Sequence, residues 1–157
     1  MNIEIRVANN LDLLEIIKFL SEPEVDNQFV KPLSQRAISI FDRVDNTFNK
    51  GIWFLAIKDG VIVACRGVKF PNPKQAKFST FVVHPKYQKK GIGYQLFIFS
   101  IEYIKEKYGN VDIISDSWEG NCKYERILKH VNHIKVDSYF DELKRPQNIK
   151  TIVYKFI

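Results

Sequence analysis

Cysteine is scarce in this sequence, and its scarcity argues against several kinds of site. Only Cys65 and Cys122 occur among 157 residues. Neither lies in a Cys-x-x-Cys or Cys/His spacing that would suit a metal ion. Because free cysteines are usually buried, we expect two buried, unpaired thiols and no metal site.

Long apolar runs, internal repeats and low-complexity tracts are absent as well. The longest apolar runs, such as Ile52–Ile57, are far too short to span a bilayer. Met1–Val7 alternates charged and apolar residues and lacks the apolar core of a signal peptide. No Gly/Ser-rich linker divides the chain, and 45% of its residues are hydrophobic. We therefore expect one folded domain over residues 1–157, cytoplasmic, without membrane contact, and monomeric or homodimeric.

The charge balance is basic, with a formal net charge of +6 at pH 7. Such a surface suits a polyanionic ligand, which could be a phosphate-bearing cofactor, a nucleic acid or an acidic protein. A generally basic surface without a specific ligand would have the same net charge. Charge alone does not choose among these classes.

Hydrophobic periodicity predicts seven strands and four helices in the order β-α-α-β-β-β-α-β-α-β-β. The strands are expected at Ile3–Val7, Ile52–Ile57, Val61–Phe70, Ala76–Val83, Val111–Ser115, Ile134–Phe140 and Thr151–Ile157. The helices are expected from Asn9 or Asn10 to Pro23, from near Ser34 to Gly51, over Gly91–Tyr108 and over Asn121–Val131. Turns are expected at Asp59-Gly60 and Pro71-Asn72-Pro73. The strand–helix–strand unit over residues 76–115 implies one parallel pair in an otherwise antiparallel sheet, and thus an α+β fold with a mixed sheet.

The most informative segment runs from the fourth predicted strand into the following helix. Pro85 ends the strand, and Gly91 and Gly93 remove side chains where a ligand must approach the backbone. The first N–H groups of a helix lack internal partners and, with the helix dipole, favour an anion. Further positive charge comes from three lysines, Lys86, Lys89 and Lys90. The segment is therefore typical of a pyrophosphate-binding loop, although the spacing of a Walker A loop is absent.

This segment resembles the acetyl-CoA signature of the GNAT N-acetyltransferases, Arg/Gln-x-x-Gly-x-Gly/Ala. Here the signature reads Gln88-Lys89-Lys90-Gly91-Ile92-Gly93, and the family's preceding pattern is matched by Phe81, Val83, Pro85 and Tyr87. The resemblance implies the GNAT fold, with parallel fourth and fifth strands that splay to admit acetyl-CoA. It also implies transfer of the acetyl group to a primary amine. The coenzyme contacts that it implies are Phe81, Val82, Val83, Gln88, Lys89, Lys90, Gly91, Ile92, Gly93, Tyr94 and Asn121.

A second feature of the same family is matched only in part. Asn121 stands where many GNAT proteins have a coenzyme-binding asparagine, although it could equally cap a helix. The family's tyrosine, which often protonates the departing thiolate, would fall at Leu128. Tyr124 lies one helical turn earlier and is the alternative acid, or else a packing residue.

The general base is less clearly indicated. Asp116 and Glu119 are expected just after the fifth strand, beside the acetyl group, and Asp116 is the first candidate. His84 lies at a variable position of the motif, and a chain of water molecules could replace any single base. Neither cysteine has a histidine partner evident in the sequence, so we expect direct transfer without an acetyl-enzyme.

Three functional hypotheses remain open on the sequence. The first is an N-acetyltransferase acting on a small molecule, a peptide N-terminus or a lysine. The second is a member that modifies nucleic acid or aminoacyl-tRNA, which the basic charge motivates. The third is a non-catalytic acyl-CoA-binding module, which the leucine at the tyrosine position favours.

Overall fold

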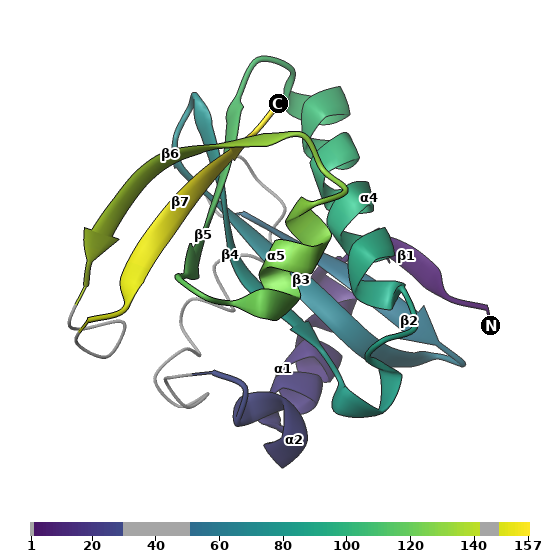
Figure 1. Cartoon of the computed structure of the whole chain (residues 1–157). Coiled ribbons are helices and arrows are strands. Elements are labelled where there is room, and N and C mark those ends of the chain that lie inside the picture. Colours follow the sequence, from purple (N-terminus) through teal and green to yellow (C-terminus); the bar gives the residue numbers. More distant parts are fainter. Residues whose placement is uncertain (1, 30–50, 142–147) are drawn as a thin grey trace.

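The strands form a seven-stranded mixed sheet in the order β1-β2-β3-β4-β5-β7-β6 (Figure 1). The computed structural model describes residues 2–29, 51–141 and 148–157, so the helix expected near Ser34–Gly51 lies almost entirely outside the described residues. The strands are β1 (Glu4–Val7), β2 (Ile52–Lys58), β3 (Val61–Asn72), β4 (Gln75–Val83), β5 (Asp112–Trp118), β6 (His133–Phe140) and β7 (Lys150–Phe156).

The pairing confirms the mixed sheet expected from the sequence. β1, β2, β3 and β4 are successively antiparallel, whereas β4 and β5 are parallel. β7 pairs antiparallel with both β5 and β6. The parallel pair is joined by helix α4 (Ile92–Tyr108), as a strand–helix–strand connection requires (Figure 1). The hairpin turn at Asp59-Gly60 has positive φ at both residues, 51° and 76°, which suits the twist of β2 and β3.

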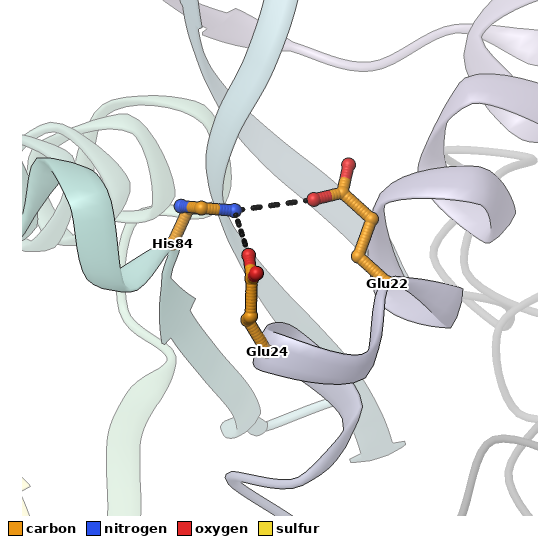
Figure 2. A group of neighbouring side chains, drawn as sticks. All are labelled: Glu22, Glu24 and His84. Carbon is orange, nitrogen blue, oxygen red and sulfur yellow. Dashed lines mark ion pairs between the residues drawn. The ribbon is translucent and has the colours of Figure 1, made fainter.

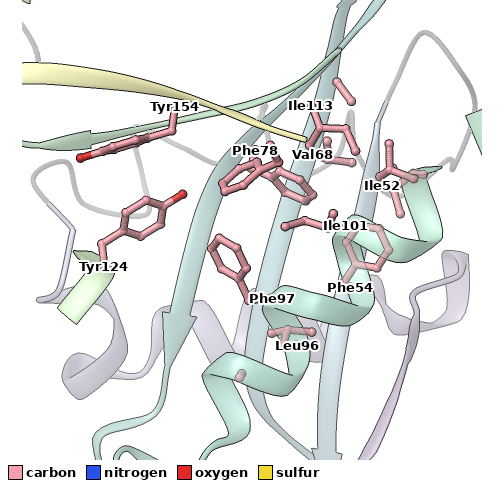
Figure 3. Close-up of a cluster of buried hydrophobic side chains, with 14 of the residues drawn as sticks. Ile52, Phe54, Val68, Phe78, Leu96, Phe97, Ile101, Ile113, Tyr124 and Tyr154 are labelled. Carbon is pink, nitrogen blue, oxygen red and sulfur yellow. The ribbon is translucent and has the colours of Figure 1, made fainter. Parts of the chain in front are cut away.

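Two apolar clusters lie on opposite faces of the sheet. Helix α1 (Leu13–Ser21) and the short helix α2 (Pro23–Asp26) cover one cluster, which includes Leu20, Trp53 and Leu55. Helices α4 and α5 (Cys122–Leu128) cover the larger one (Figures 1 and 3). Alternate residues of β2 therefore belong to different clusters, which explains why this central strand is apolar along almost its whole length.

Several boundaries differ from the sequence predictions. Pro23 starts α2 as well as following α1, because proline suits the first turn of a helix. The predicted turn at Pro71-Asn72-Pro73 is shifted, since β3 continues to Asn72 and the turn lies at Pro73 and Lys74. Pro71 falls at an irregularity of the β3–β4 register, where its missing N–H leaves no ladder bond broken. Helix α5 ends at Leu128 rather than Val131.

The fifth strand is longer than expected, and this changes the surroundings of its last residues. It continues to Trp118 because residues 115–118 pair with residues 151–154 of β7. Long-range pairing of this kind leaves no local signal. Of the two free thiols, Cys65 is buried as expected, whereas Cys122 is exposed.

Among the described residues, no helix is both long and apolar enough to cross a membrane.

Candidate active site

The sheet opens where β4 and β5 separate. Their parallel pairing covers Gln75–Phe78 and Asp112–Ser115 and does not continue along the described remainder of either strand. At the same level the β3–β4 register shifts, since Val68 pairs with Phe78 but Gly67 pairs with Thr80. Ser79 is thus an extra residue, a β-bulge. Beyond it, the backbone of β4 that faces β5 has no strand partner there and can receive an extended ligand.

The loop after β4 forms the cradle that the sequence predicts. A 3₁₀ turn, Pro85–Tyr87, leads through Lys89 at φ 62° and Gly91 at φ 80° into α4. Gly91 is the N-cap of α4, and no side chain caps the helix. A helix end of this kind offers backbone N–H groups and a partial positive charge to an anion.

Lysines from three elements gather around Tyr87 and Gln88, in the loop that leads into α4. The Nζ atoms of Lys86 and Lys90 lie 5.7 Å from the Tyr87 ring centroid, and that of Lys58 lies 5.4 Å away. Lys123 reaches over from α5, where its Nζ lies 3.3 Å from Oε1 of Gln88. The charges predicted from the loop are therefore joined by two that come from distant parts of the chain.

Gln88 and Gly93, two residues of the predicted coenzyme motif, also make contacts with β4. The Gln88 amide donates to the backbone oxygen of Val83 at 3.0 Å, which holds the loop against β4. A Cβ added to Gly93 would lie 3.3 Å from the Val83 side chain and 3.4 Å from that of Phe81. The second glycine of the motif thus has a packing reason, because it lets α4 approach β4 closely.

The other predicted coenzyme residues are distributed around this opening. The backbones of residues 81–83 follow the free edge of β4, with Val82 buried in the cluster under α1. Ile92 is buried, whereas Tyr94 is partly exposed and its ring contacts that of His130 edge-on. Asn121 caps α5 by accepting from the Tyr124 N–H at 3.3 Å, and its amide donates to Ser117 at 2.8 Å.

Tyr124 lies at the fork, the point after Phe78 and Ser115 where β4 and β5 separate. It extends from α5 toward Phe78 and Phe97, and its hydroxyl hydrogen-bonds with that of Ser115, the last β5 residue paired with β4 (Figure 3). Burial raises the pKa of Tyr124, and the nearby charge of Arg66 opposes that rise. Leu128, at the family's tyrosine position, is buried in the same cluster.

Asp116 lies inside β5 rather than in a loop after it, which corrects the predicted placement. Since strand residues alternate between faces, Asp116 points away from the face that Ser115 shares with Tyr124. Its side chain is 8% exposed, and its carboxylate lies 3.3 Å from the Nζ atom of Lys77 on β4. Asp116 and Tyr124 thus stand on opposite faces of the sheet, both at the fork.

His84 connects the end of β4 with the start of α2. Its Nε2 lies 2.9 Å from a carboxylate oxygen of Glu24 and 3.2 Å from one of Glu22, while its Nδ1 accepts from the Lys86 N–H (Figure 2). A metal-bound histidine normally donates its other ring N–H to an acceptor, yet here that nitrogen is itself the acceptor. Nε2 thus faces the two carboxylates, and Nδ1 faces the backbone of the loop. His84, which the sequence left without a role, therefore holds α2 against the loop.

Arg66 on β3 is a polar residue of this region that the sequence analysis missed. It is fully buried and stacks between Phe78 and Phe97, with its guanidinium carbon 3.8 and 3.9 Å from the two ring centroids. A signal was present, because Arg66 alternates with Ala64 and Val68, two core residues of the same strand.

Comparisons with known proteins agree with this geometry. Residues 15–120 match the model of the Acetyltransferase (GNAT) family. No curated protein sequence matches the chain. Among solved structures, an N-acetyltransferase from Staphylococcus aureus superposes with a TM-score of 0.77 at 16% identity, covering 99% of this chain and 97% of that one. The ribosomal-protein-S18-alanine N-acetyltransferase of Escherichia coli gives 0.72 at 14%, covering 99% and 93%.

A GNAT acetyltransferase from Elizabethkingia anophelis, solved with acetyl-CoA bound, gives a TM-score of 0.66 at 18% identity, covering 99% of this chain and 97% of that one. At these identities the structures establish the fold, and the family model establishes the membership. The parallel β4–β5 pair and the glycine loop at the start of α4 lie within the residues that the family model matches. The chain belongs to the GNAT family of acetyltransferases.

Proposed function

We propose that this protein is an acetyl-CoA-dependent N-acetyltransferase that moves the acetyl group directly to a primary amine. The observation that carries the proposal is the free edge of β4 beyond the bulge at Ser79, next to the uncapped start of α4. The edge suits the extended pantetheine arm, and the helix end suits the pyrophosphate. The relative from Elizabethkingia anophelis, which has the same fold, holds acetyl-CoA.

The coenzyme would be held by backbone and charge more than by long side chains. The N–H groups at the start of α4, with Gly91 leaving room above them, would receive the pyrophosphate. Lys86, Lys90 and Lys123 supply further positive charge around the loop. Because alternate residues of a strand point their N–H groups to the same edge, those of Phe81 and Val83 face the free edge, whereas that of Val82 faces Cys65 on β3. The N–H groups of Phe81 and Val83 would hydrogen-bond the pantetheine arm and the acetyl carbonyl, which polarises the carbonyl for attack.

In the proposed reaction, the amine nitrogen forms a bond to the acetyl carbonyl carbon. The C–S bond then breaks, and its electron pair stays on sulfur. The amine loses a proton to Asp116 or to water, and the sulfur gains one from Tyr124 or from water. Since Asp116 and Tyr124 stand on opposite faces at the fork, the amine and the coenzyme can enter from different sides.

Neither cysteine has the surroundings of an acyl-carrying nucleophile. Cys65 is buried in the cluster under α1, on the sheet face opposite Tyr124, and Cys122 is exposed with its Sγ 3.4 Å from the backbone oxygen of Gly120. Direct transfer relies instead on positioning of the two reactants, which can supply a large part of the barrier reduction.

Thermal melts test the coenzyme site first. Acetyl-CoA at about 100 times its Kd would stabilise the fold by about 2.7 kcal/mol. For a domain of this size that corresponds to a rise in Tm of about 5–10 °C. Transfer is then measured by release of the free coenzyme A thiol with small amines, peptides with a free N-terminus and lysine peptides as acceptors. No shift in Tm at millimolar acetyl-CoA would refute the proposal.

A further inference from the structure

Arg66 is a buried cation without a conventional partner. Its residue is 0% exposed, and among the residues that the structure describes none of its three guanidinium nitrogens makes a hydrogen bond of good geometry. The Tyr124 hydroxyl nevertheless lies close enough to interact with the guanidinium. No carboxylate of those residues forms an ion pair with it either. Arginine is almost never fully buried unless it is paired. The residue therefore calls for a reason other than stability.

The aromatic rings around Arg66 satisfy only part of its chemistry. Phe78 and Phe97 lie against the guanidinium plane, and Phe81 lies 5.1 Å from its central carbon. Cation–π contacts of this kind stabilise the charge through the two faces of the plane. The N–H donors, however, point outward from the edge of a guanidinium and not from its faces. Burial lowers the pKa of Arg66 to about 10, so the group is still a cation at neutral pH.

The position of this charge connects it with the fork between β4 and β5. Phe78 is the last β4 residue paired with β5, and Phe81, which pairs with Arg66, lies beyond the bulge. Tyr124 interacts electrostatically with Arg66, and its hydroxyl hydrogen-bonds with that of Ser115 on the other side of the fork. The charge of Asp116 on β5 raises the pKa of Tyr124, whereas the charge of Arg66 lowers it.

We propose that Arg66 is a positioning residue for acetyl transfer, whose unpaired buried charge acts through the Tyr124 hydroxyl to stabilise the negative charge left on the coenzyme sulfur. The inference rests on the proposed function. As the C–N bond forms and the C–S bond breaks, the electron pair passes to sulfur, which accepts the proton of Tyr124. The guanidinium stabilises the tyrosinate that remains until a proton returns from the amine by way of solvent.

The buried charge of Arg66 should also lower the stability of the fold. This effect distinguishes a positioning role in acetyl transfer from a purely structural role. A buried ion whose hydrogen-bonding capacity is unmet destabilises the fold, and an apolar residue of similar volume in its place is often stabilising. We therefore expect Arg66→Met to melt at a higher temperature than the parent protein. A residue kept for packing alone would behave in the opposite way.

The decisive measurement compares coenzyme A with desulfo-coenzyme A, which lacks only the thiol, by calorimetric titration at pH 8. A cysteine thiol has a pKa near 8.5, so thiols can ionise near this pH, and a site that favours the thiolate binds coenzyme A more tightly than the desulfo compound. We expect a preference of about tenfold in the parent protein, about 1.4 kcal/mol. The preference should vanish in Arg66→Met, persist largely in Arg66→Lys, and fall in Tyr124→Phe. Affinity for desulfo-coenzyme A should stay unchanged in all three variants.

The outcomes separate the two proposals. If the parent protein binds neither compound, the acetyl-CoA site itself is wrong. If it binds both, and Arg66→Met keeps the parent's preference for coenzyme A, the inference about Arg66 is overturned and the proposed function stands. A Met variant that melts lower or fails to fold would show that the cation supports the fold, and an unchanged preference in Tyr124→Phe would exclude action through the phenol.

Discussion

Gly91 allows the coenzyme loop to be tested without confusing binding with folding. Its φ of 80° is in the left-handed region, and a Cβ placed there meets no protein atom closer than Nε2 of Gln95, at 4.0 Å. Gly91→Ala therefore costs the fold only backbone strain, about 1–2 kcal/mol, less the 0.4–1 kcal/mol gained by restricting the unfolded chain. The net loss of about 1 kcal/mol should lower Tm by about 2–4 °C. Acetyl-CoA affinity should fall at least about tenfold, because the methyl group occupies the space above the helix N–H groups.

Gly60 provides a matched control within the same chain. Its φ is 76°, an added Cβ meets nothing within 4 Å, and it lies in the turn between β2 and β3. Gly60→Ala should therefore lower Tm by a similar amount while leaving acetyl-CoA affinity unchanged. Both quantities come from thermal melts and calorimetric titration of the same three proteins. Equal affinities in Gly91→Ala and Gly60→Ala would refute the assignment of the loop.

Three further predictions concern the base, the core and pH. Asp116→Asn should lower the rate of transfer to an amine by about 10²-fold or more and leave the Kd of acetyl-CoA unchanged, as separate kinetic and binding measurements would show. Ile104→Ala, at a fully buried position of α4, should lower the free energy of unfolding by about 2–5 kcal/mol, whereas Leu14→Ala, at an exposed position of α1, should change it by less than about 0.5 kcal/mol in urea titrations. The hydrogen bonds from Arg6 lower the pKa of Asp12 below its ordinary value of 3.8. The pair therefore stabilises the fold above pH 3.8, by less than about 1 kcal/mol because it is partly exposed. The difference in free energy of unfolding between the parent and Asp12→Asn should disappear as the pH falls through the lowered pKa.

The features that the sequence predicted are those written in local patterns. The hairpin at Asp59-Gly60 is marked by its turn residues, and the start of α4 is marked by glycines after Pro85. The parallel pair followed from the order of the elements, because a strand–helix–strand unit constrains its own topology. The hairpin, the helix start and the parallel pair each depend on residues or elements that are neighbours in the chain, so a single sequence predicts them.

The geometry of the fork depends on residues far apart and could not be read in the same way. The bulge at Ser79 exists only relative to the register of β3, and β5 reaches Trp118 only because β7 pairs with it. Arg66 lay within the predicted strand Val61–Phe70 and was given no role from the sequence. Its environment is assembled from β4, α4 and α5, so its burial and its unmet donors are properties of the tertiary structure.

The tyrosine position illustrates how a motif can fail while the chemistry it stands for is retained. Counting from Asn121 places the family's tyrosine at Leu128, which is buried in the core, and so suggests that the acid has been lost. Four residues along a helix correspond to about 6 Å, and Tyr124 is displaced by that amount toward the start of α5. Because Asn121 caps the helix beside Ser117, that start lies next to the fork, and the phenol reaches Ser115 there. A phenol at residue 124 also lies within the influence of Arg66, a charge that the helical motif does not encode. An acid assembled from two elements need not occupy the position that one helix predicts.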